Sequence, residues 1–250
     1  MSIAEQVTQL KQDFDAVYNS GIENGREREY DKFWDVIQQH GRRVDYKFAF
    51  AGVGWTEVNF YPKYDLTISN GTSTFHQCNF KGNLKERLEE CGVEMRFTGS
   101  FFSNTFVDCD MITELPEIDA SHATTLGATF QNMGNLVTLP LILPTATRVN
   151  WNSTFNVCKS LVNLTLTGKI YTRNGSSINL SWSKSLSKAS IENVIECLDT
   201  SVVDQYITLS LTAVNNAFET SEGAADGSTS TEWENLIATR SNWTINLLDN

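Results

Sequence analysis

The sequence predicts an α/β protein: a solenoid of short parallel strands with helical insertions, between an amino-terminal coiled-coil-like helix and a carboxyl-terminal α-β cap. Three observations predict this fold. They are a heptad-like apolar seam near the start, a segment that recurs at offsets of 24 and 25 residues, and two helix-then-strand patterns near the end. We divide the chain into a helical attachment and oligomerisation segment (1–40), the solenoid with its amino-terminal cap (41–180) and α-β capping units (181–250).

The first segment is predicted to be a helix that associates with other helices. Its apolar residues are separated by steps of 4, 3, 4 and 3, which is the a/d seam of a coiled coil. An amphipathic helix packed on its own domain gives the same pattern over about two heptads. Gly21 and Gly25 follow and loosen the helix from the next segment, which favours association. The predicted oligomerisation residues are Ile3, Val7, Leu10, Phe14 and Val17.

Three later segments align with one another: FFSNTFVDCDMITELPEI from Phe101, TLGATFQNMGNLVTLPLI from Thr125 and NWNSTFNVCKSLVNLTLT from Asn150. Each contains a Thr-Phe pair, and three residues after the Phe stands a cysteine or a methionine. Such self-similarity is the signature of a repeat architecture. The aligned apolar columns are Phe102, Leu126 and Trp151; Phe106, Phe130 and Phe155; Cys109, Met133 and Cys158; Ile112, Leu136 and Leu161; and Leu115, Leu139 and Leu164.

A unit of about 24 residues cannot bury its own apolar side and must stack on its neighbours. In such a stack the cysteines are small hydrophobes of one ladder rather than redox or metal groups. The segments 136–140 and 161–165 are predicted to be short parallel strands with prolines at their ends. The Thr-Phe-x-x-Cys corners are predicted to be tight turns or single turns of helix.

A degenerate fourth copy precedes these three. It begins at Thr74 and Phe75, with Cys78 in register. A helix-like insertion, NLKERLEECGVEMRF, follows it and is expected to displace the next strand of this copy. Its apolar residues at helical spacing are Leu84, Leu88 and Cys91.

These units resemble the BspA-type leucine-rich repeats, which carry an aromatic corner, a cysteine three residues on and an L-x-x-L strand. The resemblance covers residues 65–170, where Thr-Phe replaces the usual Ala-Phe corner. It implies a leucine-rich-repeat solenoid that serves as an adhesive or scaffolding surface. The combination with a short amino-terminal coil is similar to tail- or fibre-like virion proteins of gut bacteriophages and prophages. That likeness implies a homotrimer, although the seam itself does not decide between two and three strands.

After the last repeat the pattern changes to helix followed by strand. SLSKASIENVIECLD predicts a helix with Ser187 as its N-cap, and QYITLSLTAV predicts a strand with Ile207, Leu209 and Leu211 inward. The same order recurs in STSTEWENLIATRSNWTINLL. Residues 201–250 hold seven acids and one base, which suits an end unit with a polar outer face.

The sequence carries no recognisable catalytic or metal-binding motif. His40, His76 and His122 are far apart and form no paired pattern, so we predict no metal site, no cofactor and no catalytic residue. Asp108 and Asp110 flank Cys109, but the six to eight oxygens of a calcium site are not visible. A carboxylate pair for polysaccharide cleavage stays open as a minor alternative.

Charge and hydropathy limit the partners. A net charge of -11 argues against nucleic-acid binding, and no apolar run approaches the roughly 20 residues of a membrane span. The amino terminus is polar and acidic, so we expect no signal peptide. An adhesin on the bacterial surface would need one, whereas a virion component is assembled in the host cytoplasm.

We therefore expect a non-enzymatic phage virion protein that presents its repeat surface for host attachment. The amino-terminal helix would bind other virion proteins and form a homo-oligomer. The repeat surface would bind a host-surface glycan or protein through residues that the sequence does not identify. An intracellular protein-interaction scaffold and a bacterial cell-surface adhesin are the alternatives.

Overall fold

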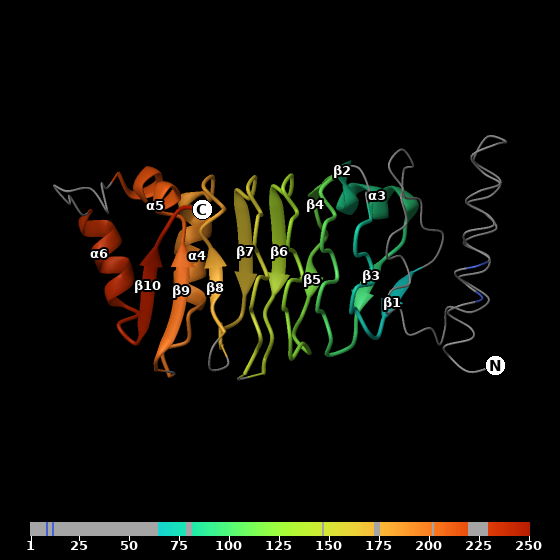
Figure 1. The fold of residues 1–250 in the computed structure, drawn as a ribbon, viewed down its shortest axis with the longest axis horizontal. Coiled ribbons are helices and arrows are strands. Elements are labelled where there is room, and N and C mark those ends of the chain that lie inside the picture. Colours follow the sequence, from blue (N-terminus) through green and yellow to red (C-terminus); the bar gives the residue numbers. More distant parts are fainter. Residues whose placement is uncertain are drawn as a thin grey trace.

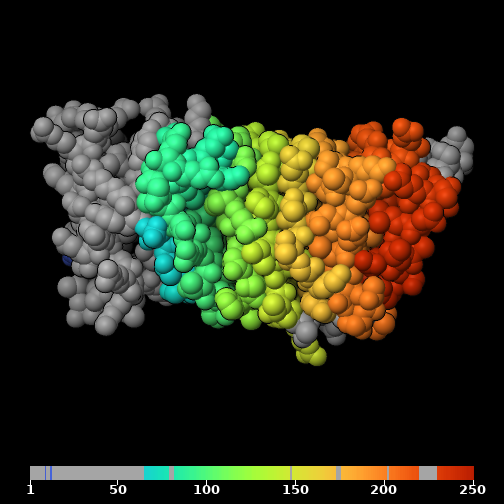
Figure 2. Space-filling view, turned by 180° about the vertical axis from the view of Figure 1, so that it is seen from behind, coloured from blue at the N-terminus to red at the C-terminus, as the bar shows by residue number. Residues whose placement is uncertain are grey.

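The computed structural model describes residues 65–78, 82–146, 148–172, 176–201, 203–219 and 230–250, together with Gln9 and Gln12. The described part is a mixed α/β fold with parallel strands, as the sequence predicts at this level. The chain advances steadily along the long axis of the molecule, so that the colours follow one another in order in Figures 1 and 2. The predicted oligomerisation residues lie outside the described residues, as does the association expected of them: Ile3, Val7, Leu10, Phe14 and Val17.

The strands form three parallel groups. The central group has the order β2-β4-β6-β5, with β7 on β6; β1 pairs with β3, and β8, β9 and β10 form the last group. The strands are β1 (Leu66–Ile68), β2 (Gly82–Asn83), β3 (Met95–Phe97), β4 (Ile112–Glu114), β5 (Ile118–Asp119), β6 (Thr138–Ile142), β7 (Asn163–Thr167), β8 (Ile178–Leu180), β9 (Gln205–Leu209) and β10 (Trp243–Leu247). The described helices are α3 (Leu84–Cys91), α4 (Lys188–Cys197), α5 (Leu211–Phe218) and α6 (Thr231–Ala238).

The Thr-Phe corners are runs of tight turns, as the sequence predicts. Each corner places two non-glycine residues at positive φ, four positions apart, such as Asn104 at 59° and Asp108 at 59°. The backbone between them bonds to the next copy: the amides of Asn104, Phe106 and Asp108 donate to the carbonyls of Gly127, Thr129 and Gln131. Neighbouring copies therefore share a continuous backbone ladder even outside the strands, which satisfies amide groups that turns otherwise leave unpaired.

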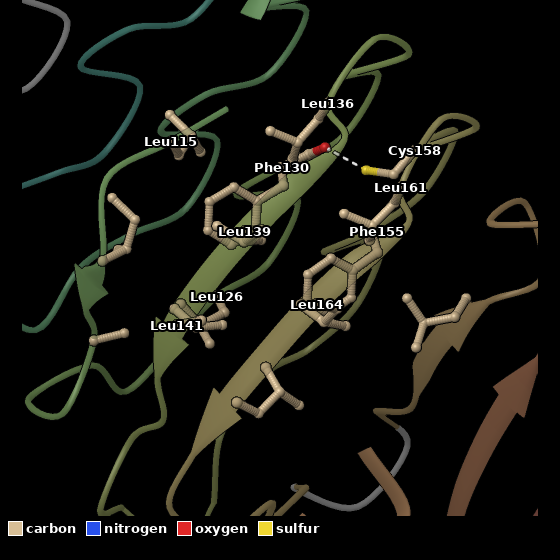
Figure 3. Close-up of a cluster of buried hydrophobic side chains, with 14 of the residues drawn as sticks. Leu115, Leu126, Phe130, Leu136, Leu139, Leu141, Phe155, Cys158, Leu161 and Leu164 are labelled. Atoms are coloured by element: carbon tan, nitrogen blue, oxygen red, sulfur yellow. Dashed lines mark hydrogen bonds between the residues drawn. The ribbon is translucent and has the colours of Figure 1, made fainter. Parts of the chain in front are cut away.

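The phenylalanines of these corners form one stack through the core. Ring centroids of Phe75 and Phe106 are 5.1 Å apart, those of Phe106 and Phe130 6.0 Å, and those of Phe130 and Phe155 5.8 Å. The planes of each pair are within 11° of parallel. Leu139 pairs with Leu164 in the adjacent strands, so the sequence alignment places equivalent residues next to one another (Figure 3).

The predicted strands are parallel, but their boundaries were wrong by two residues. β6 and β7 begin at Thr138 and Asn163 rather than at Leu136 and Leu161. The amides of both leucines close the corner instead, by donating to the carbonyls of Met133 and Cys158. The two leucines are buried, but they belong to the turn.

The prediction that prolines lie at the ends of the strands was also wrong, because Pro140 lies in the middle of β6. It has no amide hydrogen to donate. The ladder is interrupted beside it: β4 ends at Glu114, opposite Thr138, and β5 resumes at Ile118, opposite Leu141. The register shifts by one residue between these pairs, and the break accommodates the missing donor.

The insertion in the degenerate copy is helical, as predicted. α3 begins after Asn83, whose side chain accepts from the amide of Glu86, and it ends at Gly92 in the left-handed conformation. Leu84 and Leu88 are buried, whereas Cys91 is half-buried. The strand of this copy is reduced rather than displaced, because the two residues of β2 keep its place beside β4.

The last region contains both predicted helix-strand units, with one boundary corrected. α4 begins after Ser187, whose hydroxyl accepts from the amide of Ser190, and α6 precedes β10 as expected. β9 ends at Leu209, however, and Leu211 starts α5 instead of continuing the strand. Ser210 is the reason, because its hydroxyl accepts from the amide of Ala213 and caps a helix that the alternation of apolar residues did not indicate.

Candidate binding surfaces

The repeated polar residues of the corners lie inside the molecule and hold the copies together. Thr105, Thr129 and Thr154 are buried, and the hydroxyl of each bonds to a carbonyl of the preceding copy. Thr129 Oγ1 donates to Phe102 O at 2.7 Å, and Thr154 Oγ1 donates to Leu126 O at 2.8 Å. The threonine hydroxyl of each corner thus adds a cross-copy hydrogen bond.

The cysteine column is buried in the core, as predicted. Cys78, Cys109, Met133 and Cys158 are buried in one column, and all five cysteines of the chain are free. Cys109 Sγ donates to Phe75 O at 2.9 Å, and Cys158 Sγ donates to Phe130 O at 3.0 Å (Figure 3). Burial raises the pKa of the Cys158 thiol to about 12 and also raises that of Cys109. These thiols stay protonated at neutral pH and act as hydrogen-bond donors.

The two aspartates beside Cys109 act as acceptors between copies. Asp108 Oδ1 accepts from Asn132 Nδ2 at 2.7 Å, and Asp110 Oδ1 accepts from the amide of Gly134 at 2.7 Å. His76 Nε2 lies 3.6 Å from Asp108 Oδ2. Within the described ranges, no three His, Cys, Asp or Glu side chains are grouped so as to hold a metal ion.

The outward face of β6 and β7 is a candidate binding surface, which we call the strand face. It carries three rows in register: Thr138 beside Asn163, Pro140 beside Thr165, and Ile142 beside Thr167. The three β7 residues of these rows are exposed, while Leu164 and Leu166 between them are buried. Asn163 Nδ2 lies 3.4 Å from Thr138 Oγ1 and bonds one row across the strands. This face offers small polar and aliphatic groups without a charge.

The far edge of β7 is closed by side chains of α4. The amide of Leu164 donates to Ser190 Oγ at 2.9 Å, and the amide of Leu166 donates to Asn193 Oδ1 at 2.6 Å. Ser190 Oγ also donates to Val162 O, and Asn193 Nδ2 donates to Leu166 O. Polar side chains on the helix thus form the hydrogen bonds that a neighbouring strand forms elsewhere in the molecule.

This helix belongs to a fifth copy of the corner that sequence comparison missed. Leu180, Ser183 and Leu186 follow Phe155, Cys158 and Leu161 by 25 residues and are all buried. Ser183 Oγ donates to Cys158 O at 3.0 Å, which continues the bonds between copies. The spacing was present in the sequence, but the Thr-Phe pair and the cysteine had been replaced, so no matching letters remained.

A second candidate surface lies at the carboxyl-terminal end of the molecule. A hollow of about 400 Å³ opens between α6, β10 and the turn that joins them. It is lined by Glu234, Ile237, Ala238, Arg240, Ser241, Trp243 and Ile245. The exposed aromatic Tyr206 lies on neighbouring β9, next to Thr244 of β10.

Comparisons with protein-family models, with curated proteins and with solved structures found no match to this chain. None of the helices in the described ranges is long and apolar enough to cross a membrane.

Proposed function

We propose that this chain is a non-enzymatic binding protein: a BspA-like leucine-rich-repeat solenoid that presents its surface for host attachment as part of a phage virion. The fold part of the proposal is supported by the recurrence of equivalent residues at 24 and 25 positions. The phenylalanine stack, the threonine and cysteine columns and the parallel strands all follow this period.

The binding part of the proposal is carried by one observation, the strand face. Its three rows of outward groups are regular, uncharged and in register across β6 and β7, while the residues between them hold the core. Repeat arrays characteristically bind partners through such extended surfaces. Small hydroxyl and amide groups in rows match the hydroxyls of a glycan or the backbone of a protein. We therefore assign attachment to this face.

The virion part of the proposal is supported by the sequence resemblance and by the predicted amino-terminal seam. Ile3, Val7, Leu10, Phe14 and Val17 would join the chain to other virion proteins and to further copies of itself, with a trimer favoured. Multiple copies raise the strength of attachment, because each additional contact forms at a high effective concentration.

The test has two stages. Purified particles from an induced host are first examined for this chain by mass spectrometry and by immunogold labelling. The isolated protein is then bound to host cells as the wild type, as the strand-face variant Asn163→Arg with Thr165→Arg, and as the matched exposed variant Asn152→Arg. We expect the chain on particles, and loss of cell binding in the strand-face variant alone.

Each stage can fail separately. Particles without the chain contradict the virion assignment and favour an intracellular interaction scaffold. Equal cell binding by all three proteins contradicts the assignment of the strand face. Release of products from host polysaccharide contradicts the non-enzymatic assignment.

A further inference from the structure

The hollow at the carboxyl-terminal end is a groove between a helix and an open strand edge. Among the described residues, β10 pairs with β9 alone and ends the order β10-β9-β8. In Figure 1, α6 lies beyond β10 at this end of the molecule. The apolar side chains of Ile237 on α6 and Ile245 on β10 line the space between them. An added strand beside β10 would lie in this space.

The backbone groups of two residues in β10 face its open edge, and one of them, Ile245, also lines the groove. The amide of Leu248 donates to Leu209 O, on the β9 side. Because successive residues of a strand direct their backbone groups to opposite sides, Asn246 and Thr244 also face β9. The amides and carbonyls of Ile245 and Leu247 therefore point away from β9, toward the open edge.

In the part of the chain that the structure describes, this edge carries no charge, proline or bulge that would prevent strand pairing. Proteins protect such edges with charged residues, prolines, bulges or a covering element. The segment from Ser241 to Leu248 contains no charged residue and no proline, and β10 pairs with β9 through five residues without a register shift. By contrast, the side chains of α4 close the edge of β7. Among the described residues, the β10 edge is therefore regular, and no strand pairs with it.

The charge around the groove selects between possible partners. Glu232 and Glu234 lie in the first turn of α6; Glu232 pairs with Lys188, and Glu234 lines the groove. The guanidinium of Arg240 donates to the carbonyls of Ile195, Glu196 and Thr239, so its hydrogen bonds are directed into its own chain. Residues 201–250 carry six net negative charges, seven acids against one base. Two copies paired through this edge would bring two acidic ends together.

We propose that the groove between α6 and β10 binds an extended, net-basic segment of a partner protein, which adds to the sheet as a strand beside β10. Backbone bonds to Ile245 and Leu247 hold the segment, its alternate apolar side chains pack on Ile237 and Ile245, and a basic side chain faces Glu234. Strand addition of this kind takes affinity from the main chain and specificity from alternate side chains. The proposal is independent of host attachment through the strand face.

The probe is a displayed library of random linear peptides, selected on the full-length chain. We expect the selected peptides to alternate apolar residues and to be net basic. A synthetic copy of one selected peptide is then titrated against the protein, and amide hydrogen exchange is followed by residue. Strand addition protects the amides of Ile245 and Leu247, whereas those of Thr244 and Asn246 are already bonded to β9 and change little.

Two substitutions separate strand addition from simple contact. Leu247→Pro removes an amide that faces the open edge, where proline is tolerated in a strand, and we expect a folded protein that no longer binds the peptide. Asn246→Pro removes an amide that faces β9 and is expected to reduce the stability of this region. Glu234→Lys should weaken the binding of the basic peptide roughly 2- to 5-fold. The same substitution should strengthen the binding of a second peptide in which glutamate replaces lysine.

Three outcomes overturn the proposal. The first is a library that yields no peptide whose binding is lost in Leu247→Pro. The second is a selected peptide that binds without protecting Ile245 and Leu247. The third is a dimer in light scattering that Leu247→Pro dissociates, because the edge would then belong to a second copy of this chain.

Discussion

The central repeats and the carboxyl-terminal region join one structural unit to the next in different ways. Between residues 101 and 167, each copy bonds to the next through main-chain ladders and through identical columns, such as the stack of Phe106, Phe130 and Phe155. After residue 180 the neighbours differ in kind, and the edge of β7 meets the helix α4 through Ser190 and Asn193. Identical neighbours stabilise the first region, whereas in the second a few specific side chains of α4 replace the strand ladder beside β7 before it resumes between β8, β9 and β10.

The difference indicates where the effect of a substitution reaches neighbouring copies and where it stays local. In the repeats, one residue contacts equivalent residues on both sides, so its loss affects two interfaces. In the second region, a contact such as that of Asn193 has no equivalent elsewhere in the described chain. Substitutions in the two regions should therefore differ in how far their effect spreads.

The largest effect is expected for Leu136→Asp in the repeat core. Leu136 is completely buried in its column, so the substitution places an unpaired carboxylate among apolar side chains. We expect a loss of at least about 4 kcal/mol and an unfolded repeat region, measured by denaturant unfolding and circular dichroism.

Its control is the adjacent residue. Val137 is 37% exposed, and Val137→Asp introduces the same charge on the surface. We expect the control to stay folded with a change of less than about 1 kcal/mol. Equal stability of the two variants would show that the column is not the core of the repeats.

A smaller and more local effect is expected for Asn193→Ala in α4. The side chain accepts from the amide of Leu166 and donates to its carbonyl, so its loss leaves two groups of β7 unpaired. We expect a loss of about 1 to 3 kcal/mol. Hydrogen exchange should increase for β7 and α4 but not for β4.

The neighbouring substitution Glu192→Ala is the matched control, since no side-chain hydrogen bond to β7 is among the described contacts of Glu192. It should leave the exchange of Leu166 unchanged. If Asn193→Ala also increases exchange throughout the repeats, the two regions form a single cooperative unit, and the contrast between them fails.

The sequence predicted the repeat columns and the helices because each depends on a short-range pattern. The Phe, Cys and Leu columns recur at one spacing, and Ser187 precedes an apolar helical stripe. The fifth corner was missed because Leu180, Ser183 and Leu186 keep the spacing of the other corners but not their residue types. The ends of β6 and β7 were misplaced because apolar residues of the turn and of the strand look alike in sequence.

The candidate surfaces were less predictable for a physical reason. The strand face follows from the register of β6 and β7, which places Asn163 beside Thr138. The groove follows from where α6 packs, and no local pattern around Glu234 or Ile245 indicates it. Predicted association through Ile3, Val7, Leu10, Phe14 and Val17 stays a prediction, because these residues lie outside the described part.

A moderate effect is expected for Thr129→Val in the corner column. The valine keeps the shape of the side chain but removes the hydroxyl that donates to Phe102 O at 2.7 Å. The same carbonyl also accepts from Thr105 Oγ1, so it is not left unpaired. We expect a loss of roughly 0.5 to 1.5 kcal/mol in denaturant unfolding.

Thr165→Val is its control, because Thr165 is exposed on the strand face. Its expected change is within about 0.5 kcal/mol. A similar loss in both variants would mean that valine itself, and not the missing cross-copy hydrogen bond, lowers the stability.

The smallest effect is expected for Asp249→Asn and depends on pH. Burial acts to raise the pKa of Asp249, but hydrogen bonds from Thr212 and Ser210 outweigh it and lower the pKa. A carboxyl whose folded pKa is lowered stabilises the protein above its unfolded value, near about 3.9, and this contribution is lost as the pH falls toward the folded value. Stability of the last region, followed by tryptophan fluorescence in urea, should therefore decrease on acidification.

Asp249→Asn should flatten this acid dependence, because the amide does not titrate. Thr212→Val removes one donor and should reduce the dependence in part. The same substitutions should leave the repeats unchanged, since the carboxylate accepts hydrogen bonds from the start of α5 and otherwise interacts with Lys184, which lies outside residues 101–167. If the wild type and Asp249→Asn respond identically to acid, the hydrogen bonds from Thr212 and Ser210 do not favour the ionised carboxyl, and another group controls the acid response of this end.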